Sequence, residues 1–162
     1  MKESRYTEAI GVLLGFRFSA VRQTLRTLRE AGLVPGLRGG DLQPEQLPAV
    51  ILGLCAPTFA TAADTYERLA ALRLADAADL PKSAGDALTA IVRILPRSPV
   101  LGSLDLDDGF LTVGNGQMTI DALSLAGKRA VVRYGTSDNA DNALHRFPLN
   151  GIRELVKTME KK

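Results

Sequence analysis

The segment from Thr7 to Pro35 constrains the fold most strongly, because it has the pattern of two short helices joined by a tight turn. Thr7 and Ser19 are suitable N-cap residues for the two helices. Gly15 lies where the first helix must end, since glycine adopts positive φ without a steric penalty. Apolar residues at helical spacing predict the buried faces: Ile10, Leu13 and Leu14 in the first helix, and Val21, Leu25 and Leu28 in the second.

The second helix carries a basic stripe opposite its apolar one. Arg22, Arg26 and Arg29 are spaced at i, i+4 and i+7, so their guanidinium groups lie on one side. Arginine binds phosphates, and it can bond a guanine edge with two hydrogen bonds. The pattern therefore predicts contact with double-stranded DNA through Arg17, Ser19, Arg22, Gln23, Arg26, Arg29 and, in the glycine-rich loop Gly36–Gly40, Arg38.

The charge distribution favours the same end of the chain. Residues 1–40 contain seven basic and three acidic residues, whereas the full chain of 162 residues has a net charge of only +2. Positive charge is therefore concentrated where the helix pair is expected, as it is in proteins that face a polyanion. The alternative is that the basic stripe is only a solvated helix face. The chain would then be a non-enzymatic module for protein–protein interaction.

The segment from Gly11 to Leu25 resembles a helix-turn-helix, with a small residue at Gly11, a turn glycine at Gly15 and an apolar Val21. Thr24 stands where such motifs usually have an apolar residue. In outline, the order of parts is similar to that of small phage and prophage DNA-binding proteins, including small terminase subunits. This resemblance implies transcription regulation or initiation of phage DNA packaging.

The remaining sequence predicts more helices and then a small sheet. Helices are expected from Pro44 to about Leu54, from Thr58 or Thr61 to about Ala75, from Ser83 to Leu95, and after a cap at Asn150. Between them, Asn115-Gly116 predicts a hairpin within an antiparallel meander from about Phe110 to Gly135. We expect a mainly α chain with a small C-terminal β meander, an α+β class.

We expect the chain to be organised in three parts. These are a helix-turn-helix domain at 1–56, a helical segment at 57–99, and the meander with a last helix at 100–162. A lone helix-turn-helix reads few bases, so we expect a homo-oligomer. The alanine-rich helix from Thr61 to about Ala75 and the meander are the candidate interfaces.

The sequence offers no catalytic arrangement. His145 is the single histidine, and no nucleophile motif or glycine-rich phosphate loop accompanies it. Asp105, Asp107 and Asp108 raise the possibility of a metal site, but the ligand spacing of an EF-hand is absent, and a solvated strand is the simpler interpretation. Cys55 lies in an apolar run, as a buried cysteine would. We expect no enzyme activity, cofactor, metal or membrane association, and a cytoplasmic location.

Overall fold

The computed structural model describes residues 3–36, 41–76, 79–114, 116–136 and 144–161. Within these ranges the helices are α1 Glu3–Leu14, α2 Phe18–Glu30, α3 Leu47–Leu54, α4 Ala62–Ala70, α5 Ala84–Ile94 and α6 Leu149–Glu160. Short 3-10 turns, Pro44–Gln46 and Phe59–Thr61, precede α3 and α4. The molecule is about 48% helix and 24% strand, so the expected α+β class with helix predominating is confirmed.

Antiparallel pairing joins all the strands of the sheet. They are β1 Val100–Leu101, β2 Leu104–Gly114, β3 Gln117–Ser124, β4 Arg129–Tyr134 and β5 His145–Pro148. Strand β3 lies between β2 and β4, and the other edge of β2 pairs with β1 at its start and with β5 at its end. The expected hairpin and meander order is confirmed, but the sheet is larger than predicted.

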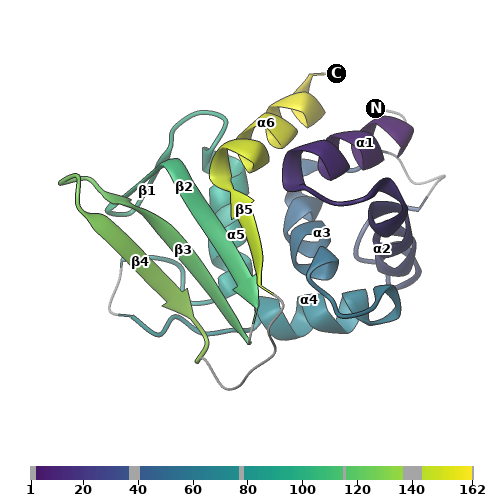
Figure 1. Cartoon of the computed structure of the whole chain (residues 1–162), viewed down its shortest axis with the longest axis horizontal. Coiled ribbons are helices and arrows are strands. Elements are labelled where there is room, and N and C mark those ends of the chain that lie inside the picture. Colours follow the sequence, from purple (N-terminus) through teal and green to yellow (C-terminus); the bar gives the residue numbers. More distant parts are fainter. Residues whose placement is uncertain (1–2, 37–40, 77–78, 115, 137–143, 162) are drawn as a thin grey trace.

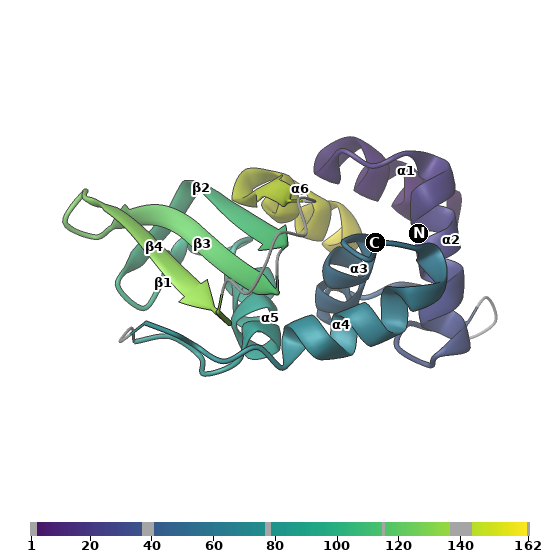
Figure 2. The same ribbon diagram turned by 60° about the horizontal axis from the view of Figure 1, so that its bottom comes forward.

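The helices α1 to α4 gather at one end of the molecule and the sheet forms the other (Figure 1). A turned view shows α5 and α6 between these two parts (Figure 2). Helix α6 packs on both α1 and β2, and α5 packs on both α3 and β1. These two helices therefore connect the N-terminal helices with the sheet.

One continuous core runs through the molecule, from Tyr6 in α1 to Met159 in α6. The inner face of the sheet joins it through alternate residues, as the two-residue period of a strand requires: Leu111, Val113, Met118, Ile120, Val132, Tyr134 and Phe147. The buried Tyr134 hydroxyl donates a hydrogen bond to the carbonyl oxygen of Pro81, 2.9 Å away. The three-part division at 56 and 99 stays a prediction.

Several expected helix ends are wrong. Helix α1 begins at Glu3, so Thr7 is a buried residue inside it, and Tyr6 joins Ile10 and Leu14 on the buried face, against which half-buried Leu13 also packs. The expected cap at Asn150 is also wrong, because α6 begins at Leu149 and Asn150 bonds Asp108 instead. Helix α4 ends at Ala70, where the next helix comes close: a Cβ on Gly85 would lie 3.0 Å from the Ala70 methyl carbon.

Candidate nucleic-acid interface

Helix α2 is held in place by its apolar face. Val21, Leu25 and Leu28 are buried, as predicted, and Thr24 is buried with them. The close packing of α2 on α3 depends on Gly53, where an added Cβ would lie 3.3 Å from Leu28 and 3.4 Å from the Thr24 methyl group. The methyl group of Thr24 therefore packs where an apolar side chain was expected. This packing fixes which face of α2 is left to solvent.

The connection between α1 and α2 is tight. Gly15 has a φ of +79°, which confirms the expected left-handed turn residue. The expected cap at Ser19 is wrong, since the N-cap position belongs to Arg17, two residues earlier, and the side chain of Arg17 makes no capping bond. Phe18, the first residue of α2, packs its ring against Gly11 of α1, where an added Cβ would lie 2.7 Å from the ring.

The outer face of α2 brings together most of the residues that the sequence predicted to bind DNA. The side chains of Arg17, Ser19, Arg22, Gln23 and Arg26 are all exposed. Ser19, Arg22, Gln23 and Arg26 follow the i, i+3, i+4 and i+7 spacing of one helix face. Among the described residues, neither Arg17 nor Arg22 has a carboxylate within ion-pair distance. Two guanidinium groups therefore remain available to an anionic partner.

Arg26 has an internal partner, but a weak one. Its Nε atom lies 3.0 Å from Oε1 of Glu30, four residues further along α2. The two side chains are 74% and 64% exposed, so water and salt screen the attraction. Exposed ion pairs of this kind contribute about 0.2–1 kcal/mol to stability. A phosphate group can therefore readily replace Glu30 as the partner of Arg26.

Arg29 departs from the expected stripe. Its side chain is half-buried, and its Nε atom donates a 3.1 Å hydrogen bond to the Pro35 carbonyl oxygen beyond the end of α2. The expectation that Arg29 would project from a purely polar face is therefore wrong. A DNA contact by Arg29 stays a prediction, and Arg38 lies outside the described residues.

Two exposed apolar residues on the helix pair escaped the sequence interpretation. Val12 is 69% exposed and Phe18 is 50% exposed. A cap at Ser19 leaves Phe18 in the connection between the helices, whereas Phe18 is the first residue of α2. The sequence signal that could have located it is Gly11, seven residues earlier, which leaves room for a large ring.

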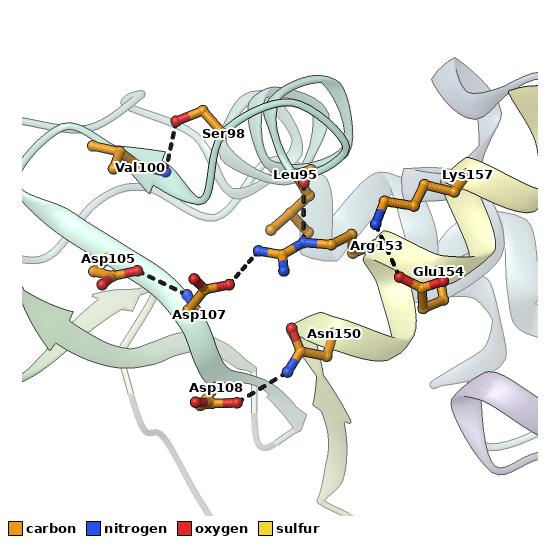
Figure 3. A network of polar contacts seen from close by, with 10 residues as sticks. All are labelled: Leu95, Ser98, Val100, Asp105, Asp107, Asp108, Asn150, Arg153, Glu154 and Lys157. Carbon is orange, nitrogen blue, oxygen red and sulfur yellow. Dashed lines mark hydrogen bonds and ion pairs between the residues drawn. The ribbon is translucent and has the colours of Figure 1, made fainter.

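The acidic cluster at the start of β2 has structural partners (Figure 3). Asp107 forms an ion pair with Arg153 of α6, whose Nε atom also donates to the Leu95 carbonyl oxygen at 3.0 Å. Asp108 accepts a 3.1 Å hydrogen bond from Asn150. Over the described ranges, no group of three or more His, Cys, Asp or Glu side chains has the geometry to hold a metal ion. The cluster joins the sheet to α6.

The outer face of the sheet holds an open pocket of about 680 Å³. Two of its charged residues pair with each other: Arg129 binds Asp121, and their hydrogen bond lowers the pKa of the Asp121 carboxyl group. The guanidinium carbon of Arg146 lies 3.8 Å from the centre of the Phe110 ring. Exposed Leu123 lines the same pocket. This pocket combines acidic, basic and apolar side chains, whereas the exposed face of α2 is basic and polar.

The remaining reactive side chains belong to packed regions. His145 stacks on Phe16 and Phe147, with ring centres 5.7 Å and 6.5 Å away, and burial lowers its pKa. Cys55 donates to the Ile51 carbonyl oxygen at 3.2 Å, and burial raises its pKa to about 12. A thiol with so high a pKa stays protonated near neutral pH and is a poor nucleophile. The interpretation of Cys55 as a small apolar side chain therefore fits its surroundings.

Two further findings bear on the class of protein. Over the described residues, no helix has both the length and the apolar character needed to cross a bilayer. No protein-family model, curated protein or solved structure matches this chain. Its function must therefore be inferred from its own residues and their arrangement.

Proposed function

We propose that this protein binds double-stranded DNA through the outer face of α2. The observation that carries the proposal is the gathering of Arg22, Gln23 and Arg26 on one exposed face of α2, with exposed Arg17 at the N-cap position of the same helix. Arginine pairs with phosphates and with guanine, and glutamine pairs with adenine. The proposed biological role is transcription regulation or the initiation of phage DNA packaging, as the resemblance to small phage DNA-binding proteins implies.

In this proposal α1 and α2 form a helix-turn-helix, and α2 is the helix that enters the major groove. The turn at Gly15, the close contact at Gly11 and the burial of Val21 support this assignment. Residues early in α2, Arg22 and Gln23, face base edges, while Arg26 binds the phosphate backbone. The protein acts as a homo-oligomer, because one such helix reads few bases.

A second candidate function is protein–protein interaction through the sheet. The open outer face of the sheet, where exposed Leu123 and Phe110 line the same pocket, favours it. The two candidates differ in their response to salt, since counterions are released from DNA by every phosphate contact.

The test is fluorescence anisotropy with a labelled 20-base-pair duplex at 50 and 200 mM salt. Two phosphate contacts, by Arg17 and Arg26, give a rise in Kd of about twelvefold between these concentrations. Binding that tightens at low salt in this way supports the DNA proposal. If the protein leaves the duplex unbound at 50 mM salt and micromolar concentration, the DNA proposal is wrong and the sheet becomes the candidate surface.

A further inference from the structure

Phe18 is an aromatic side chain held in a fixed place at the start of a basic helix. It is the first residue of α2 and is 50% exposed. One side of its ring packs over Gly11 of α1, where even a Cβ atom would approach to within 2.7 Å. The ring is therefore supported by α1, while the rest of it faces solvent. Leaving this much aromatic surface in water has a free-energy cost that binding would recover.

The neighbours of Phe18 are the residues of the proposed DNA surface. Arg17 and Ser19 adjoin it in sequence, and Arg22 follows four residues later, on the same side of α2. Among the described residues Arg22 has no carboxylate at ion-pair distance. An apolar ring and an available guanidinium group therefore lie beside each other in the first two turns of the helix.

In duplex DNA, one base offers an apolar group next to hydrogen-bonding and phosphate groups, as this pair of side chains requires. In the major groove the base edges present hydrogen-bonding groups, and the C5-methyl group of thymine is their apolar feature. We propose that Phe18 contacts a thymine methyl group next to the base or phosphate bound by Arg22, and so makes the protein select thymine at that position. This inference rests on the proposed DNA-binding function and adds a specificity-determining residue to it.

The experiment starts by selecting high-affinity duplexes from a random 20-base-pair library with the full-length protein. Each thymine of the selected duplex is then replaced in turn by uracil, which pairs identically but lacks the methyl group. The expected result is one position per binding site at which uracil lowers the affinity of the wild-type protein by about fourfold, the equivalent of one buried methyl group. This comparison requires no variant, so misfolding cannot affect it.

Two variants then assign the effect to Phe18. Phe18→Ala should bind the thymine and uracil duplexes equally. Leu125→Ala removes another exposed apolar side chain, in the turn between β3 and β4, and should keep the fourfold difference. The two failures can be told apart. If no duplex is enriched, the DNA-binding function itself is wrong; if duplexes are enriched but contain no thymine, or tolerate uracil everywhere, only the role of Phe18 is wrong.

Discussion

Arg22, Arg26 and Arg29 share a helical spacing but differ in what they contact. Arg22 extends into solvent, Arg26 pairs with Glu30, and Arg29 bonds the Pro35 carbonyl oxygen. Spacing places the three on one side of α2, but it carries no information on how the chain turns between the end of α2 and Pro35. For this reason the sequence could predict that the three arginines share one side of α2, but it could not predict which of them have partners within the protein. Arg22 is exposed and, among the described residues, has no ion-pair partner, so it is the first of the three to test for a DNA contact.

Replacing Arg22 with alanine should therefore weaken DNA binding without affecting the fold. Removing a bidentate pair of hydrogen bonds to guanine costs about 1–3 kcal/mol and relaxes the preference for that base. The matched control is Arg93→Ala, which removes an exposed arginine from the last turn of α5. Anisotropy titrations should separate the two variants, while their thermal unfolding curves should resemble that of the wild type. Equal affinities for both variants would remove Arg22 from the interface.

Gly11 provides a test of the packing beneath Phe18. An added Cβ would lie 2.7 Å from the Phe18 ring and 2.9 Å from the Phe16 carbonyl oxygen, so the turn must shift. We expect Gly11→Ala to lower the free energy of unfolding by about 1–3 kcal/mol, the usual cost of overpacking. Gly36→Ala is the control, because nothing lies within 4 Å of its Cβ position. Urea denaturation measures both, and a stable Gly11→Ala would contradict the described contact.

At the scale of elements, local signals predicted some helix boundaries and missed others. Ser83 caps α5 as expected, because its side chain accepts a hydrogen bond from the Asp86 backbone N–H. The start of α2 was missed because Ser19 offers a local capping signal, whereas Phe18, the observed first residue, packs on Gly11 of the other helix. A local pattern cannot report such a contact. The same reason explains why Phe18 was absent from the predicted site.

The contact between the α1–α2 turn and β5 predicts a dependence of stability on pH. Burial lowers the pKa of His145 below its ordinary value of 6.5, because the charged form is disfavoured among Phe16 and Phe147. The unfolded chain therefore binds the proton first as the pH falls, and stability decreases below about pH 6.5. The contribution of neutral, buried His145 to stability is therefore complete above that pH.

The measurement is the urea midpoint at pH 7.5 and pH 6.0. The wild-type midpoint should fall on acidification, whereas that of His145→Phe should change less, since this variant keeps an aromatic ring and removes the only histidine. Comparing the two proteins cancels the titration of other groups. An identical response in both would show that His145 is not the group responsible.

At the scale of the whole molecule, the sequence predicted the central hairpin but underestimated the sheet. The apolar alternation of Leu111 and Val113 against Met118 and Ile120 is strong, and these strands pair as expected. Strand β1 has two residues and β5 has four, too few for a period to be read. The start of β2 was hidden because Asp107 and Asp108 interrupt the alternation at a bulge, which their contacts with α6 stabilise.

The proposed helix-turn-helix also predicts an assembly. Such modules pair so that two recognition helices reach successive turns of the DNA, and a single one has little contact area. Analytical ultracentrifugation at tens of micromolar protein should therefore give a species larger than one 17.3 kDa chain. If the free protein is a monomer, two chains should bind each selected duplex. A monomer in both settings would contradict this prediction.

The central claim is that the outer face of α2 neutralises DNA phosphates, and the salt dependence of binding tests it most directly. The variant combines Arg17→Ala, Arg22→Ala and Arg26→Ala, all at exposed side chains. The slope of log K against log salt should decrease in magnitude by about one unit for each phosphate that the variant no longer neutralises, which is about two to three units in total. Circular dichroism should show that the helices remain intact. A folded triple variant with the wild-type slope would contradict the assignment of this face to DNA.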